Sequence, residues 1–201
     1  MKVAVLVSGS GTNLQAILDG LKAGTLGPAR VVVVVSNVAG VRALERAQAA
    51  GVATEVLPHK GFPSRQAFDE ALVATLRKHD VELVALAGFM RLLSPTFLTA
   101  FPQRVLNIHP ALLPAFPGVH AQKQALDYGA RITGCTVHFV DEGCDTGPIV
   151  AQAAVPVLDG DDEAALTARI LAEEHRLYPA AIRAVAEGRV HVDGRRVTMR
   201  P

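Results

Sequence analysis

The sequence predicts an α/β fold with a mostly parallel, doubly wound, Rossmann-like sheet, helices on both faces and an antiparallel extension in the C-terminal half. Apolar runs alternate with helical segments through the first hundred residues, and this alternation requires parallel strands joined by crossovers. Two later strands are separated only by a loop, which favours an antiparallel pair. With 201 residues, of which 50% are hydrophobic, we expect one domain over 1–201, with halves at 1–100 and 101–201.

Four strands are expected in the first half, each a run of β-branched and aliphatic residues of the kind that parallel sheets bury on both faces. These runs lie at 3–7, 30–36, 53–57 and 81–87. The helices between them begin near Leu14, include 44–47 and extend over 64–78. Arg65 lies near the start of the third helix, where its charge opposes the helix dipole. This indicates an external role, although a solvated surface arginine is the commoner outcome.

The second half opens with a strand that Pro110 should end, because proline cannot donate a strand hydrogen bond. A helix is expected at 121–128, followed by strands at 131–140 and 149–155. Acidic residues at 159–163 precede a long helix at 164–187, in which Pro179 should produce a kink or a break. An Asp-Gly turn predicts a closing hairpin over 190–197.

The composition argues against several classes of protein. With 20 basic and 19 acidic residues, a net charge of +1 and no Trp, a nucleic-acid surface is not expected. The longest apolar run, at 31–35, is too short to cross a bilayer, and the first strand is too short for a signal-peptide core. We therefore expect a cytoplasmic protein without a membrane partner. Cys135 and Cys144 alone provide neither a disulfide framework nor a structural zinc site.

The glycine-rich segment at 8–13, here called the phosphate turn, joins the first strand to the first helix. Free backbone amides and the positive end of the helix dipole make such a turn an anion site. A dinucleotide is disfavoured because Leu14 stands where its fingerprint needs a small residue, and the Walker lysine is missing. A phosphate monoester is therefore the favoured ligand, and a tight turn without a ligand is the alternative.

Polar side chains emerge where the strand before Pro110 ends. Asn107 and His109 are two residues apart and therefore share one face of that strand. A histidine in this position is equally often only hydrogen-bonded within the structure. Thr136 and His138 similarly share a face of a later strand.

The segment after the fourth strand, 88–95, combines apolar residues with Met90 and Arg91, a composition typical of the wall of a pocket for a flat ligand. Core packing is the competing explanation for Phe89 and Leu92. The acidic loop at 141–145 could hold a hard cation, but it lacks the alternating oxygen ligands of a calcium loop. We expect no metal there, and instead one carboxylate directed at His109.

Four motifs follow one another along the chain: Ser-Gly-Ser-Gly-Thr-Asn at 8–13, Leu-Ala-Gly-Phe-Met-Arg at 86–91, Leu-Asn-Ile-His-Pro at 106–110 with Leu-Leu-Pro at 112–114, and the segment 137–148. In this order, and over essentially the whole chain, they resemble the phosphoribosylglycinamide formyltransferase family. The third and fourth are shared with other formyltetrahydrofolate enzymes, whereas the first resembles the glycinamide ribonucleotide enzyme. Ala115 departs from the family, in which relatives often have Lys or Arg.

The resemblance implies transfer of a formyl group from 10-formyltetrahydrofolate to the amine of glycinamide ribonucleotide, in purine biosynthesis. The catalytic residues would be Asn107, His109 and Asp145. The ribonucleotide would contact Gly11, Thr12, Asn13 and Glu174. The folate would contact Arg65, Met90, Arg91, Leu93, Asn107, Val140 and Asp141. Thr136 and His138 would support the site, the first half would bind the ribonucleotide and the second half would carry catalysis and the folate. The partners would be these small molecules, with the protein a monomer or a homodimer.

Direct attack by the amine would create a tetrahedral oxyanion. Asn107 and the imidazolium of His109 could stabilise it, at roughly 3 to 4 kcal/mol for each such donor. Asp145 would favour the charged imidazole and could relay protons. A methionyl-tRNA formyltransferase-like or hydrolase-like enzyme and a non-catalytic ribonucleotide-binding module are the alternatives.

Overall fold

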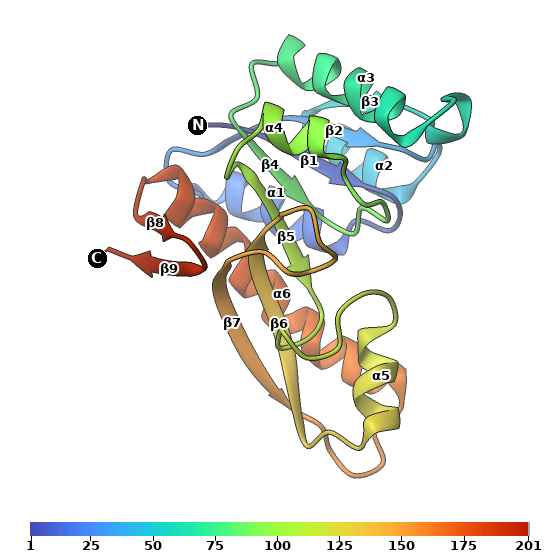
Figure 1. The fold of residues 1–201 in the computed structure, drawn as a ribbon, viewed down its shortest axis with the longest axis vertical. Coiled ribbons are helices and arrows are strands. Elements are labelled where there is room, and N and C mark those ends of the chain that lie inside the picture. The colour runs from blue at the N-terminus through green and yellow to red at the C-terminus, as the bar shows by residue number, and fades with distance from the viewer. Residues whose placement is uncertain (201) are drawn as a thin grey trace.

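The computed structural model describes residues 1–200 and contains a seven-stranded sheet (Figure 1). The strands in chain order are β1 (Lys2–Val7), β2 (Arg30–Ser36), β3 (Ala53–Val56), β4 (Leu83–Leu86), β5 (Val105–His109), β6 (Ile132–Phe139) and β7 (Ile149–Pro156). They lie side by side in the order β3-β2-β1-β4-β5-β6-β7. The first five are parallel, while β6 runs antiparallel to both β5 and β7. The predicted fold class is therefore confirmed.

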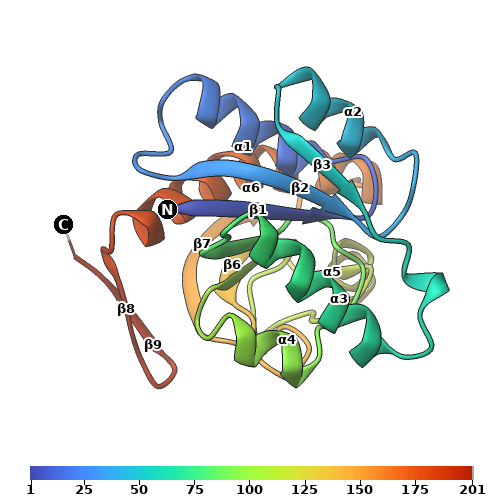
Figure 2. The same ribbon diagram turned by 90° about the horizontal axis from the view of Figure 1, so that it is seen from above.

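Helices cover both faces of the sheet. They are α1 (Thr12–Lys22), α2 (Arg42–Ala49), α3 (Arg65–Lys78), α4 (Pro95–Ala100), α5 (Ala121–Tyr128) and α6 (Glu163–Ala186), with a 3-10 turn at His59–Gly61. Figure 2 shows α1, α2 and α6 on one face and α3 and α4 on the other. Alternate residues of β1 supply the two core layers, because Val5 packs with the first group of helices and Leu6 with the second. Burial of both faces explains the uninterrupted apolar strand sequences.

Two local features differ from the sequence prediction. The short helix α4 was not expected, although Pro95 occupies its first turn, where a missing N–H costs nothing. A kink or a break was expected at Pro179, and the break is wrong, because α6 continues through this residue as one helix of 24 residues. Tyr178 and Ile182, on either side of Pro179, are both buried at 0% exposure. This packing holds the two halves of the helix together despite the lost hydrogen bond.

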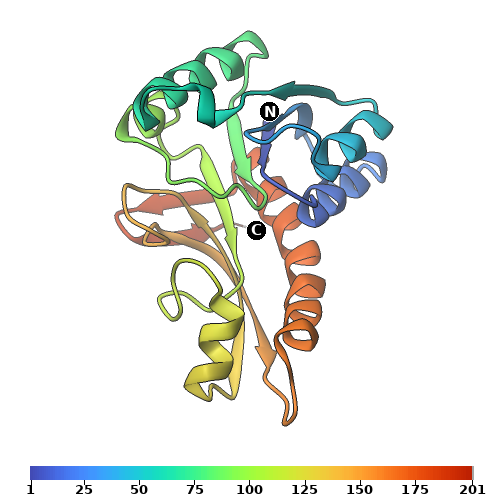
Figure 3. The ribbon, with the colours of Figure 1, turned by 90° about the vertical axis from the view of Figure 1, so that its right-hand side faces the viewer.

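The C-terminal hairpin consists of β8 (Val190–Asp193) and β9 (Arg196–Met199), which pair antiparallel in a separate sheet, as predicted. In Figure 3 the long helix α6 runs along the sheet as far as this hairpin. Val190, Val192 and Val197 pack against the larger core cluster. Within residues 1–200, no helix is long and apolar enough to cross a membrane.

Candidate active site

The phosphate turn forms a cavity of about 190 Å³ at the N-terminus of α1. Gly11 adopts a left-handed conformation with φ of 71°, and a Cβ there would lie 2.7 Å from Cβ of Ala43. Only glycine therefore suits this position. The helix α2 holds the turn from behind, because the amide of Ala43 donates to the Gly9 carbonyl at 3.2 Å and Nε of Arg46 donates to the Ser10 carbonyl at 2.9 Å.

Glu174 of α6 reaches this turn through Asn13. The side-chain amide nitrogen of Asn13 donates to Oε2 of Glu174 at 2.7 Å, although the two residues are 161 positions apart. Glu174 is only 4% exposed. Burial raises the pKa of its carboxyl group to about 7, and the hydrogen bond from Asn13 opposes this rise only in part. A buried carboxyl group therefore titrates near neutral pH beside the phosphate turn.

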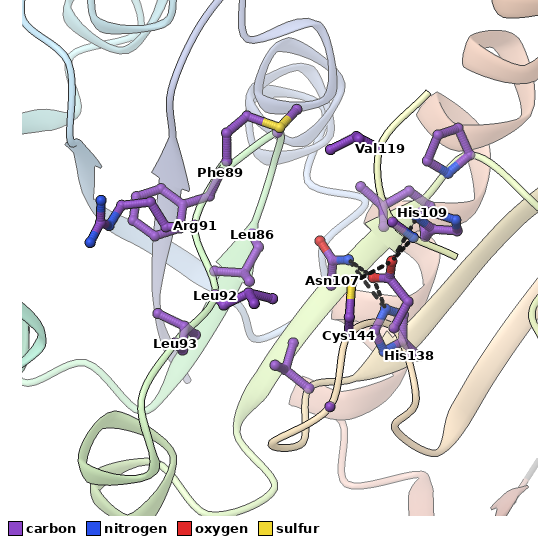
Figure 4. A pocket seen from close by; sticks show the side chains of 18 of the residues that line it. Leu86, Phe89, Arg91, Leu92, Leu93, Asn107, His109, Val119, His138 and Cys144 are labelled. Carbon is purple, nitrogen blue, oxygen red and sulfur yellow. Dashed lines mark hydrogen bonds and ion pairs between the residues drawn. The ribbon is translucent and has the colours of Figure 1, made fainter. Parts of the chain in front are cut away.

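A larger cavity of about 830 Å³ lies over the middle of the sheet. Its floor is a row of three residues on neighbouring strands, because Asn107 of β5 pairs with Leu86 of β4 on one side and His138 of β6 on the other. Figure 4 shows these three side chains around the cavity. The predicted common face of Asn107 and His109 agrees with this arrangement, since both line the cavity.

Asp145 is the centre of the polar contacts in this cavity. Its Oδ2 accepts a hydrogen bond from the Gly118 amide at 2.8 Å and lies 3.4 Å from Nδ1 of His109. Its Oδ1 lies 3.4 Å from the amide nitrogen of Asn107 and 3.6 Å from Nε2 of His138. Burial alone would raise the pKa of Asp145, but His138, the Gly118 amide and His109 lower it to about 2. The carboxylate directed at His109 is therefore ionised across the physiological range.

His109 is 4% exposed, and both of its ring nitrogens face acceptors. Nε2 lies 2.8 Å from the carbonyl oxygen of Phe116, and Nδ1 faces Asp145. Phe116 itself has a left-handed backbone, with φ of 53°. A fully protonated ring can donate to both groups, so the loop after β5 and the acidic loop fix the orientation of the ring together.

Two further side chains orient these groups. The amide nitrogen of Asn107 lies 3.2 Å from Nε2 of His138, whose Nδ1 lies 2.9 Å from the Phe139 carbonyl. Thr136 is fully buried, and its hydroxyl donates to the Ala111 carbonyl at 2.7 Å and accepts from the Leu113 amide at 3.0 Å. Thr136 therefore fixes the position of the backbone at Ala111 and Leu113, shortly after His109.

Residues 88–94 are here called the wall segment, and 88–93 of them line one side of the larger cavity. Phe89 and Leu93 are buried at 8% and 6% exposure, whereas Met90 and Leu92 are 74% and 55% exposed. Core packing therefore accounts for Phe89 but not for Leu92. The guanidinium of Arg91 lies over the ring of Phe68, 4.8 Å from its centre, and in Figure 4 it points away from Asn107.

The two cysteines carry no sign of a nucleophile. Burial raises the pKa of Cys135 to about 12. Burial, followed by the nearby charge of Asp145, also raises the pKa of Cys144. Both thiols are therefore protonated at neutral pH and are poor nucleophiles. Among residues 1–200, no group of three or more His, Cys, Asp or Glu side chains could hold a metal ion.

Comparison with known proteins identifies the family. Residues 1–182 match the formyl transferase family model. The chain is 46% identical over 190 residues to phosphoribosylglycinamide formyltransferase of Escherichia coli, which covers 94% of this chain and 89% of that protein. The chain belongs to the phosphoribosylglycinamide formyltransferase family.

Solved structures named for this family have the same fold. Glycinamide ribonucleotide transformylase 1 from Symbiobacterium toebii superposes with a TM-score of 0.97 at 58% identity, covering 99% of this chain and 93% of that one. The chain is also 53% identical to part of the trifunctional purine biosynthetic protein adenosine-3 of Drosophila pseudoobscura, over 93% of this chain. It spans only 14% of the length of that relative.

The structure brings most of the predicted site residues of this phosphoribosylglycinamide formyltransferase family member into two adjoining cavities. The larger cavity is lined by Met90, Arg91, Leu93, Asn107, His109, His138, Val140, Asp141 and Asp145. The smaller is lined by Gly11, Thr12 and Asn13, among others. Arg65 lines neither and is the exposed first residue of α3, so its contact with the folate stays a prediction.

Sequence reasoning missed three groups that the structure brings to the site. Leu86 was placed in a strand and in the motif at 86–91 but was given no role in the site, whereas it forms part of the cavity floor. The Phe116 carbonyl and the Gly118 amide are backbone groups, which carry no signal in residue type. The one signal in the sequence near these groups is the Pro117-Gly118 pair, which favours a turn there.

Proposed function

We propose that this chain transfers the formyl group of 10-formyltetrahydrofolate to the amine of glycinamide ribonucleotide. One observation carries the proposal. The anion-type cavity at α1 and the larger cavity with its amide, imidazole and carboxylate share two lining residues, Gly88 and Met90. A phosphate bound in the first would therefore place the rest of a ribonucleotide toward the polar groups of the second.

The smaller cavity has the groups that a ribonucleotide needs. Backbone amides of Gly11, Thr12 and Asn13 at the start of α1 would hold the phosphate, because the first amides of a helix lack partners within it. Glu174 lies behind Asn13 and would contact the glycinamide part. Asn13 also has a buried side-chain oxygen without a partner among residues 1–200, which a ligand N–H could satisfy.

The larger cavity has the character of a folate site. Its walls combine apolar groups such as Leu86 and Leu92 with the polar edge of the acidic loop at 141–145, which suits a flat ring with hydrogen-bonding edges. Arg91 has a buried Nε without a partner among the described residues. The folate would contact Met90, Arg91, Leu93, Asn107, Val140 and Asp141. Arg65 would lie near the folate tail.

The chemistry follows from the polar groups at the floor. As the amine attacks, negative charge develops on the formyl oxygen, and Asn107 and His109 would donate hydrogen bonds to it. Asp145 would favour the charged form of His109 and could relay the proton that the amine must lose, directly or through water. The bond between the formyl carbon and N10 of the folate would then break, and tetrahydrofolate would leave with a proton on that nitrogen. His138 would orient Asn107, and Thr136 would hold the chain beyond His109.

The contacts of His109 add one requirement to this mechanism. Its Nε2 already donates toward the Phe116 carbonyl, and its Nδ1 faces Asp145. For Nε2 to donate to the formyl oxygen, its hydrogen bond to the Phe116 carbonyl must break. The contact with Asp145 can persist through this exchange and would hold the ring in place.

A transfer assay with both substrates tests the proposed function. Purified protein should convert glycinamide ribonucleotide only when 10-formyltetrahydrofolate is present, and EDTA should leave the rate unchanged. Formylation of charged initiator tRNA, or release of formate without an acceptor, would support the tRNA enzyme or the hydrolase instead. Ribonucleotide binding without folate binding would support the non-catalytic module. Strong inhibition by EDTA would return the acidic loop to consideration as a metal site.

A further inference from the structure

Ser8 connects the two cavities but has no place in the mechanism above. It follows β1 directly and lines the smaller cavity. Its hydroxyl donates to Oδ1 of Asn37 at 2.6 Å and accepts from the backbone amide of Met90 at 3.0 Å. Met90 belongs to the wall segment of the larger cavity. One hydroxyl group therefore joins the ends of β1, β2 and β4, which are neighbours in the sheet.

The direction of these bonds is fixed by the partners. A backbone amide can only donate and a side-chain carbonyl oxygen can only accept, so the single proton of the hydroxyl goes to Asn37 and its lone pair faces Met90. Asn37 is itself immobilised, since it is 4% exposed and its amide nitrogen lies 3.1 Å from Nδ1 of His59. Ser8 is thus held in the one rotamer that receives the Met90 amide.

Few hydrogen bonds to other elements hold the wall segment near the cavity, although Phe89 and Leu93 pack in the core and Arg91 lies over Phe68. Gly88 is its first residue, with φ of 72° and open space around the position of a Cβ. Met90 is 74% exposed, so its side chain provides little packing. At the far end of the segment, buried Asp69 accepts a hydrogen bond from the Ser94 amide. Between these two anchors the segment contains Arg91, Leu92 and Leu93, which line the cavity.

We propose that Ser8 is a positioning residue for the folate cavity, which fixes the near end of the wall segment through the Met90 amide. This inference rests on the proposed function, because it assigns the larger cavity to the folate. It assigns no contact between Ser8 and the reacting atoms. Ser8 and Met90 also line the smaller cavity, but the phosphate is assigned to the backbone amides of Gly11, Thr12 and Asn13, which the Ser8 hydroxyl does not contact. Ribonucleotide affinity should therefore depend on this hydroxyl much less than folate affinity does.

The test compares Ser8→Ala with Ser8→Thr, which retains the hydroxyl, in the full chain. Thr75→Ala is the matched control, because it removes one hydroxyl that bonds to a carbonyl within α3, away from both cavities. Calorimetric titration gives the Kd of tetrahydrofolate, and separately that of glycinamide ribonucleotide. Hydrogen exchange measured by mass spectrometry follows the peptide that contains residues 88–94.

For Ser8→Ala we expect the Kd of tetrahydrofolate to rise about three- to tenfold, as loss of one hydrogen bond allows, with faster exchange in the wall segment. The Kd of the ribonucleotide should change less than about twofold, and Ser8→Thr should restore most of the folate affinity. Unchanged folate affinity in Ser8→Ala would overturn the inference, as would an equal loss in Thr75→Ala or an equal loss of ribonucleotide affinity. Wild-type protein that binds neither ligand and shows no transfer would instead refute the proposed function, and this inference with it.

Discussion

Replacing Glu174 by Gln should change how the stability of the protein depends on pH. In the folded chain, burial raises the pKa of Glu174 from 4.5 to about 7. Between these two values the folded state holds a proton that the unfolded state has released, so the free energy of unfolding falls as pH rises. Gln cannot ionise, and the variant therefore lacks this contribution.

The magnitude follows from the two pKa values. The contribution of Glu174 to the free energy of unfolding falls by about 2.5 kcal/mol between about pH 5 and pH 8. Each unit of pKa difference corresponds to about 1.4 kcal/mol, and part of the ionisation in the unfolded state already lies below pH 5. Glu174 is 4% exposed, so solvent screening removes little of this. Compared with wild type, Glu174→Gln should therefore gain about 2.5 kcal/mol of stability from pH 5 to pH 8.

Urea unfolding at both pH values measures this difference. Far-UV circular dichroism is the appropriate signal, because the chain has no Trp. Glu173→Gln is the control, since it removes the adjacent carboxylate, which pairs with Arg176 on the surface. The reasoning would be refuted if the free energy of unfolding of the wild type minus that of Glu174→Gln stays constant within about 0.5 kcal/mol between the two pH values.

Three other substitutions test the site. Asn107→Ala should lower turnover about 10²- to 10³-fold by removing an oxyanion donor, and near-normal steady-state rates would exclude that role. Asp145→Asn should lower turnover about 10²- to 10⁴-fold, while calorimetry should show that ribonucleotide affinity is retained. Loss of ribonucleotide binding with unchanged turnover would contradict proton relay by this group. Gly11→Ala should weaken ribonucleotide binding at least about tenfold, because the new Cβ meets Ala43 and the residue has a positive φ. Unchanged affinity in that titration would mean that the phosphate turn can shift.

The sequence was sufficient to predict the strands and turns that are determined by their own local residues. Continuous apolar runs predicted the parallel strands, Pro110 predicted the end of β5, and the Asp-Gly turn predicted the final hairpin. A contact between His109 and one carboxylate of the acidic loop was also accessible from the residue types, and the family resemblance identified that carboxylate as Asp145. The continuity of α6 through Pro179 could not be predicted from the sequence, because packing of Tyr178 against distant strands overrides the local preference of proline.

The parts that could not be predicted depend on register and on loop conformation. The row of Leu86, Asn107 and His138 exists only because β4, β5 and β6 pair in one particular alignment, which no single strand sequence specifies. Likewise, the Phe116 carbonyl reaches His109 only because Phe116 adopts a left-handed conformation that its residue type disfavours.

The two buried carboxyl groups show how the fold distributes charge between the cavities. Asp145 has the Gly118 amide and two imidazoles around it, and its pKa falls to about 2 in spite of burial. Among the residues that the structure describes, Glu174 has only the Asn13 side-chain amide as a partner, so burial prevails and its pKa rises to about 7. Environments that separate the pKa values of two acids in this way assign them different tasks. Under the proposed function, Asp145 supplies a negative charge beside His109 before the reaction begins, whereas the charge of Glu174 depends on what binds beside it. An ammonium group on the ribonucleotide would lower the pKa of Glu174, and loss of that positive charge during transfer would raise it again.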